Sequence, residues 1–289
     1  MSTIETRGQS VSVTANGLTH HVLRYGQSDA PDMLILPGIT SPAATADFLA
    51  VRLADMGFRV TVPDARGRGK TDRAQAGQYR MADYAADVAA LIETLELNNP
   101  VLVGHSMGAR TAAAYADIHA PGTHGLLVLV DPPVSGPGRG AYPTPRESFV
   151  QQLREAQRGT HADEVRRFYP KWPLRELELR AQVLASCDET AVLESHQNFQ
   201  TEDFFGYWAR LTQPVLLVRG AESPVVTDAA AEDLRRARPD IDIVSVPDAG
   251  HMVPWDNLPG FFDAVRRPLQ TEVGRQRPHR SPDAEQERT

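Results

Sequence analysis

The sequence has almost no cysteine and no excess of positive charge. Cys187 is the single cysteine among 289 residues, which excludes an intramolecular disulfide framework and a metal cluster built from cysteines. The histidines show no zinc spacing such as H-E-x-x-H, so we expect neither a metal nor another cofactor. The formal net charge is −7, and it offers no electrostatic reason to expect nucleic acid as a partner.

Long apolar runs are also missing. The longest, such as residues 126–130, are far shorter than the ~20 residues that a membrane-spanning helix needs. Residues 1–10 lack the apolar core of a secretory signal. We therefore expect a cytoplasmic protein that does not use a membrane as partner. Nothing in the sequence indicates its oligomeric state.

The chain does contain an alternation of short apolar runs with amphipathic segments. Asn16-Gly17, flanked by residues 11–14 and 18–24, predicts a tight hairpin. All-apolar runs predict strands buried on both faces, and apolar residues three or four apart predict helices. The expected strands are residues 11–14, 18–24, 33–36, 58–62, 101–103, 126–130, 215–218 and 241–246, and the expected helices are residues 43–56, 84–97, 108–118, 229–236 and 257–267. This order is typical of an α/β fold, in which a mostly parallel sheet has helices on both faces.

The alternation is interrupted once. Residues 132–211 show no clear strand, only helical segments rich in Arg, Glu, Gln, Trp and Phe. We interpret them as a helical cap inserted into one core, which residues 1–131 and 212–269 form together. Residues 270–289 have almost no apolar side chains, so we expect a disordered tail there.

Residues 104–108 have the sequence G-H-S-M-G, which matches the pattern G-x-S-x-G. An expected strand precedes them and a helix of small residues follows, the setting in which a strained turn exposes a nucleophilic serine. Glycine at both ends permits the strained backbone and close packing. Ser106 is therefore the candidate nucleophile, and the alternative is a glycine–serine turn without chemistry.

A serine nucleophile needs a base and an acid, which follow it in the order serine, acid, histidine in this type of fold. His251, in the loop after the expected strand 241–246, is the candidate base. The usual place of the acid is the loop after strand 215–218, but Ser223 occupies that position and Glu222 lies one residue short of it. Asp131 directly follows strand 126–130, from where a carboxylate can orient a histidine on a neighbouring strand. Asp131 and Glu222 both remain candidates on these grounds.

An oxyanion hole needs two backbone N–H donors. Met107, the residue after the serine, supplies one of them. The loop after strand 33–36 supplies the other, and because Pro37 has no N–H, Ile39 is the expected donor.

Several segments between about residues 11 and 269 together resemble the α/β-hydrolase superfamily. They are L-P-G-I-T-S-P-A at residues 36–43, R-G-R-G at 66–69, G-H-S-M-G-A-R at 104–110 and A-G-H-M at 249–252. The run V-L-V-D-P-P-V-S-G-P-G-R at 128–139, followed by A-Y-P at 141–143, is similar in particular to the N-formylmaleamate deformylases of aerobic nicotinate breakdown. Gly140 stands where that family's pattern has a second basic residue, and residues 144–208 match it only loosely.

The resemblance implies a triad of Ser106, Asp131 and His251, with the acid after the earlier strand. It also implies metal-independent hydrolysis of the formyl C–N bond of N-formylmaleamate to maleamate and formate. A small anionic substrate requires a cation in its pocket. The candidates for binding it are basic and aromatic residues of the cap segment: Arg139, Tyr142, Arg146, Arg166, Arg167, Lys171 and Trp172.

Two other functions stay open. One is a serine hydrolase of another small carboxylate-bearing amide, enamide or ester, similar to the acetamidomethylene-succinate hydrolases. The other is a ligand receptor on the α/β-hydrolase fold, which has no need of an intact triad. Dehalogenases and epoxide hydrolases are disfavoured because they use aspartate at the position of Ser106.

Overall fold

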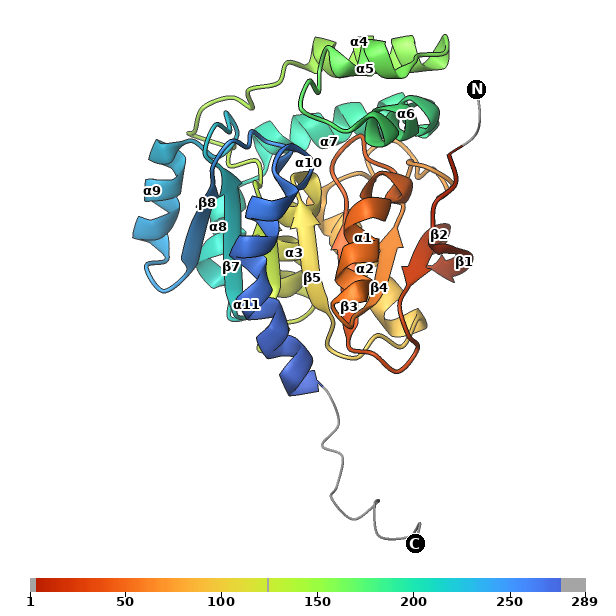
Figure 1. Ribbon diagram of the computed structural model, residues 1–289. Coiled ribbons are helices and arrows are strands. Elements are labelled where there is room, and N and C mark those ends of the chain that lie inside the picture. The colour runs from red at the N-terminus through yellow and green to blue at the C-terminus, as the bar shows by residue number, and fades with distance from the viewer. Residues whose placement is uncertain (1–3, 124, 277–289) are drawn as a thin grey trace, which may run out of the picture.

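The computed structural model describes residues 4–123 and 125–276. Eight strands form one sheet in the order β1-β2-β4-β3-β5-β6-β7-β8 (Figure 1). The strands are β1 (Gln9–Ala15), β2 (Leu18–Tyr25), β3 (Asp32–Leu36), β4 (Arg59–Pro63), β5 (Val101–His105), β6 (Leu127–Val130), β7 (Val215–Gly220) and β8 (Asp242–Val246). β1 pairs antiparallel with β2, and β2 pairs antiparallel with β4. The other six strands, β3 to β8, are parallel to one another. The prediction of a mostly parallel sheet is confirmed.

The N-terminal hairpin forms where Asn16-Gly17 predicts it. Both residues have positive φ angles, 49° for Asn16 and 73° for Gly17, which a two-residue turn between right-twisted strands requires. The Asn16 side chain also donates a hydrogen bond to Asp87 Oδ1 at 2.8 Å. This bond ties the hairpin turn to the first long helix on the sheet.

The central strands are apolar on both sides because helices cover both faces of the sheet. Along β5, Val101 and Val103 pack into one core cluster while Leu102 packs into the other. One face is covered by η1 (Ala43–Ala46), α1 (Asp47–Asp55) and α11 (Leu258–Gln276), and the other by α2 (Met81–Thr94), α3 (Met107–Ile118), α8 (Phe204–Arg210) and α9 (Asp228–Ala237). Within residues 4–123 and 125–276, no helix combines the length and apolar character that a membrane span requires.

The segment expected to form a helical cap contains five α-helices. Four of them lie over the carboxyl ends of the parallel strands (Figure 1): α4 (Arg146–Gln157), α5 (Ala162–Arg166), α6 (Leu174–Val183) and α7 (Glu189–Thr201), with the short η2 (Leu184–Ser186) between the last two. The fifth, α8, packs against α3 and α9 beside the sheet instead. Trp208 fixes it there by donating from its indole N–H to Leu234 O at 3.0 Å.

The expectation of a disordered tail from residue 270 is wrong for residues 270–276. Helix α11 continues through Pro268 to Gln276. Val265 and Leu269 are buried in the core cluster beneath α1 and α11, and Val273 packs on that cluster. These residues are four apart, so one apolar stripe extends into the polar segment and keeps it helical. Residues 277–289 lie outside the described part of the chain.

Candidate active site

Ser106 occupies a sharp turn between β5 and α3. Its backbone angles are φ 55° and ψ −117°, a conformation that costs about 1–3 kcal/mol for a residue other than glycine. The Ser106 N–H donates to Val130 O at 2.9 Å and so holds the turn against β6. A Cβ on Gly108 would overlap the carbonyl of Leu36, and one on Gly104 would overlap the backbone of Gly108. Both glycines of the motif are therefore required by the close packing that presents the serine.

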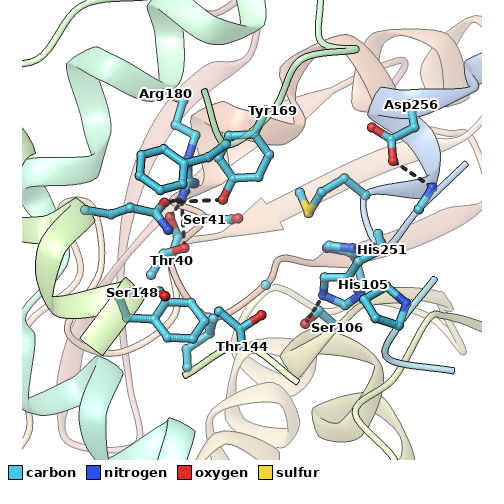
Figure 2. Close-up of a pocket in the computed structure, with 18 of the residues that line it drawn as sticks. Thr40, Ser41, His105, Ser106, Thr144, Ser148, Tyr169, Arg180, His251 and Asp256 are labelled. Carbon is cyan, nitrogen blue, oxygen red and sulfur yellow. Dashed lines mark hydrogen bonds between the residues drawn. The ribbon is translucent and has the colours of Figure 1, made fainter. Parts of the chain in front are cut away.

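The structure brings Ser106, His251 and Asp131 into one hydrogen-bonded chain. His251 lies between β8 and the short helix α10 (Val253–Asp256). Its Nε2 is 2.9 Å from Ser106 Oγ, and its Nδ1 is 2.7 Å from Asp131 Oδ2 (Figure 2 shows the contact with Ser106). Asp131 directly follows β6 and is completely buried. This arrangement suits a serine that loses its proton to a histidine oriented by a carboxylate.

The position in which the sequence suggested an acid holds a hydrogen-bond donor to Asp131. The Ser223 hydroxyl donates to Asp131 Oδ2 at 2.5 Å, and Ser223 Oγ itself accepts the N–H groups of Val225 and Val226. Glu222 instead points outward and forms an ion pair with Lys171 at 2.9 Å, with more than half of its side chain exposed. Of the two candidate acids, only Asp131 contacts His251 in the described residues.

His105 is a part of the site for which the sequence analysis found no role. Its Nε2–H donates to the backbone carbonyl of His251 at 2.9 Å, and the two imidazole rings lie 5.0 Å apart. Burial, together with the neighbouring His251, lowers the pKa of His105 to about 3. The ring is therefore neutral and supports the loop that presents His251.

The expected oxyanion donors flank the nucleophile. Met107 is the first residue of α3, so its N–H has no partner within the helix. Neither this N–H nor that of Ile39 donates to another residue in the described part of the chain. The Ile39 loop runs beside Ser106, because a Cβ added to Gly38 would lie 3.5 Å from Ser106 Cβ. Two unused N–H groups thus come from the two segments that border the serine.

Ser106 and His251 open into a cavity of about 430 Å³ beneath the cap helices. Tyr142 lines it beside the serine, and burial raises the pKa of its phenol. The wall opposite Ser106 and His251 is formed by Thr40, Tyr169 and Arg180 (Figure 2). The volume suits a small organic molecule.

Arg180 is the cavity residue of greatest chemical interest that the sequence analysis missed. It lies on α6 and is 1% exposed. Its guanidinium donates to Thr40 O at 3.1 Å, Thr40 Oγ1 at 3.0 Å and Gln152 Oε1 at 3.3 Å, and it stacks on the Tyr169 ring. Among the described residues it has no carboxylate partner, and its Nε has no acceptor. Its spacing from the buried Leu177 and Leu184 places it on the apolar face of α6, and this was the available signal.

Most residues predicted to bind the substrate lie elsewhere. Tyr142 and Lys171 line the cavity, but Lys171 is paired with Glu222. Arg139 stacks on Phe205 in a separate depression. The remaining candidates do not line the cavity either: Arg146 and Arg167 are exposed, Arg166 is partly exposed beside Asp163, and Trp172 is buried between Tyr169 and Trp255. They were misplaced because residue type alone does not show whether a basic or aromatic side chain on a helix faces solvent, a packing interface or the cavity.

Comparisons with known proteins agree with this architecture. Residues 31–258 match the family model described as the alpha/beta hydrolase fold. The chain is 42% identical over 253 residues to the N-formylmaleamate deformylase of Pseudomonas putida, an alignment that covers 88% of this chain and 93% of that protein. It is 33% identical over 241 residues to the 2-(acetamidomethylene)succinate hydrolase of Mesorhizobium japonicum, covering 78% and 84% of the two chains.

A solved structure gives the same result. The crystal structure of an N-formylmaleamic acid deformylase from Pseudomonas putida superposes with a TM-score of 0.82 at 39% identity, covering 89% of this chain and all of that one. The fold, the matched family model and these relatives agree. The chain is a hydrolase that belongs to the α/β-hydrolase fold family.

Proposed function

We propose that the protein hydrolyses the formyl C–N bond of N-formylmaleamate, giving maleamate and formate, through a formyl ester on Ser106. The proposal rests on one arrangement: the Ser106–His251–Asp131 chain and the unpaired guanidinium of Arg180 face each other across one small cavity (Figure 2). The first group suits attack on a carbonyl, and the second suits a carboxylate. The 42% identical relative, an N-formylmaleamate deformylase, supports the same substrate.

In the first half of the reaction, Ser106 Oγ attacks the formyl carbon while His251 Nε2 takes its proton. The negative charge that develops on the formyl oxygen is held by the N–H groups of Ile39 and Met107. The C–N bond then breaks, and His251 returns the proton to the departing nitrogen. That nitrogen lies between two carbonyl groups in the substrate, so it leaves more readily than the nitrogen of a simple amide.

In the second half, water attacks the formyl ester. His251 removes a proton from the water, and the same two N–H groups hold the second tetrahedral oxyanion. Collapse releases formate and regenerates the Ser106 hydroxyl. Buried Asp131, with the Ser223 hydroxyl donating to it, keeps His251 oriented and stabilises its charged form in both halves.

The charge of the cavity favours a substrate with one carboxylate. Arg180 and Lys171 are the two cationic residues among those that line it, and Glu222 and Asp256 are the two acidic ones. Lys171 is already paired with Glu222. N-formylmaleamate carries one carboxylate, which Arg180 can match. A 2-(acetamidomethylene)succinate carries two, and the second would lie in this cavity without an unpaired cation, at a cost in free energy.

The test compares three substrates with the purified protein: N-formylmaleamate, 2-(acetamidomethylene)succinate and p-nitrophenyl acetate. Formate release from N-formylmaleamate should exceed turnover of the other two in kcat/KM, and Ser106→Ala should abolish it. If no formate is released above background, N-formylmaleamate is not the substrate. If the protein still hydrolyses p-nitrophenyl acetate in that case, the serine mechanism stands. Full turnover by Ser106→Ala would refute the nucleophile, and tight binding without turnover by the unmodified protein would favour a receptor.

A further inference from the structure

Arg68 is a fully buried cation that the proposed reaction does not yet use. Its side chain is 0% exposed, and it has no carboxylate partner among the described residues. Every acceptor of its five N–H groups is neutral. The acceptors are Ile39 O at 3.0 Å, Arg66 O at 2.8 Å, the Tyr84 hydroxyl, Ala191 O at 3.1 Å and Ser195 Oγ at 3.0 Å. A satisfied but unneutralised charge in the interior is expensive, because burial removes its hydration.

The contacts of Arg68 converge on the two residues expected to hold the oxyanion. Its Nε–H donates to the carbonyl of Ile39, which fixes the orientation of the residue whose own N–H borders Ser106. Its Nη2 lies 3.9 Å from the Met107 Sδ. One guanidinium thus contacts both residues of the proposed oxyanion hole, Ile39 through its backbone carbonyl and Met107 through its side chain.

The Ile39 loop is held from the cap side as well. Arg180, on α6, donates to the carbonyl of Thr40, the next residue along. Two consecutive carbonyls of the loop therefore accept hydrogen bonds from two different buried arginines. Arg180 faces the cavity, whereas Arg68 does not line it. The two residues therefore serve different purposes, although they hold the same loop.

We propose that Arg68 is a positioning residue for the oxyanion hole, which keeps the Ile39 and Met107 N–H groups directed at the oxygen of the reacting carbonyl. Its unneutralised charge also favours negative charge near the hole, since electrostatic interactions are strong in a site from which water is excluded. This role rests on the proposed serine mechanism but not on the identity of the substrate. It applies to any ester or amide that Ser106 attacks.

The test uses p-nitrophenyl acetate and methylboronic acid, which forms a tetrahedral adduct with an activated serine. Removing one direct oxyanion donor typically lowers kcat by about 10²–10³-fold. Arg68→Lys keeps a charge but loses the planar fork that reaches Ile39, Tyr84 and Ser195 together, so we expect kcat and boronic acid affinity to fall in parallel, each by about 10-fold. KM should stay within about threefold, because the ground state makes little use of the hole.

Arg110→Lys is the matched control. Arg110 is also fully buried and donates only to carbonyls, those of Pro133, Ser135 and Glu202, but it contacts neither Ile39 nor Met107. This variant should lower the melting temperature about as much as Arg68→Lys does, without changing boronic acid affinity.

Three outcomes would overturn the role: a folded Arg68→Lys variant with unchanged kcat and boronic acid affinity, an equal loss of both in Arg110→Lys, or a loss confined to KM. Failure to release formate from N-formylmaleamate is a separate result. It would leave the ester and boronic acid measurements intact, so the two proposals fail independently.

Discussion

Replacing Asp131 with Asn should remove the charge that stabilises protonated His251 while keeping the ring in place. Asp131 Oδ2 accepts from both His251 Nδ1 and the Ser223 hydroxyl, whereas Oδ1 accepts only the Gly220 N–H, at 3.4 Å. The amide oxygen of an asparagine will therefore take the Oδ2 position, and its NH₂ group will take the other. His251 keeps its tautomer, and the negative charge is what is lost.

The loss can be estimated from the distance between the charges. Opposite unit charges about 4 Å apart interact by about 4 kcal/mol at an effective dielectric constant near 20. Because about 1.36 kcal/mol corresponds to a factor of ten in rate, kcat should fall about 10³-fold. Formate release from N-formylmaleamate, or nitrophenol release from an ester, measures it.

Glu222→Gln is the control for the competing acid. Glu222 forms an exposed pair with Lys171, and such pairs contribute about 0–1 kcal/mol, so kcat should change by less than about threefold. The reasoning is refuted if Asp131→Asn retains more than a tenth of the activity, or if Glu222→Gln loses as much as Asp131→Asn.

Three further predictions concern other buried groups. Arg180→Gln should raise the KM for N-formylmaleamate about 10–100-fold, because a charge-assisted hydrogen bond of about 1.5–3 kcal/mol is lost, whereas the exposed Arg167→Gln should not; equal KM values for the two variants in a formate assay would contradict this. Burial lowers the pKa of His105 to about 3 from an ordinary 6.5. Between these two pH values the unfolded state binds a proton at His105 and the folded state does not, so the free energy of unfolding decreases as pH falls from 6.5 toward 3. Between pH 7 and pH 5 the unmodified protein should lose about 2 kcal/mol more than His105→Asn in urea unfolding, and parallel losses would show that His105 titrates normally. Burial raises the pKa of the Cys187 thiol to about 11, so iodoacetamide should leave the folded protein unlabelled by mass spectrometry; rapid labelling at pH 8 would disprove its burial.

The parts of the fold that the sequence predicted well are those with local signals. Asn16-Gly17 requires particular backbone angles, and residues 104–108 require a strand before them and a helix after them. The helical end of the chain was missed for a different reason. Val265, Leu269 and Val273 form one apolar stripe, but Pro268 and the many polar residues around them make the average composition of this segment that of a disordered tail.

The site divides in the same way. The structure places Ser106, His251 and Asp131 together. The order of motifs along the chain indicated the serine and the histidine, but it left Asp131 and Glu222 both open as the acid, and the family resemblance implied Asp131. Arg180 has no such motif. Residues 132–211 contain many arginines, and only its spacing from Leu177 and Leu184, on the apolar face of α6, distinguishes it from the others. No role was predicted for His105, because the sequence could not show that its ring donates to the carbonyl of His251.

Three arginines among the described residues are fully buried, Arg68, Arg110 and Arg180, and they have a consequence for how the molecule unfolds. Arg68, in the loop after β4, and Arg110, on α3, reach acceptors on α7 or at its end, whereas Arg180 extends from the cap to the loop after β3. Separating the cap from the core would leave the arginine side chains of both parts without their hydrogen-bond acceptors. The two parts should therefore melt in one calorimetric transition, and a cap transplanted from a relative would need to bring acceptors for Arg68 and Arg110 and a donor for the Thr40 carbonyl. The cap is therefore part of the same cooperative folding unit as the sheet, and it cannot be treated as a removable lid.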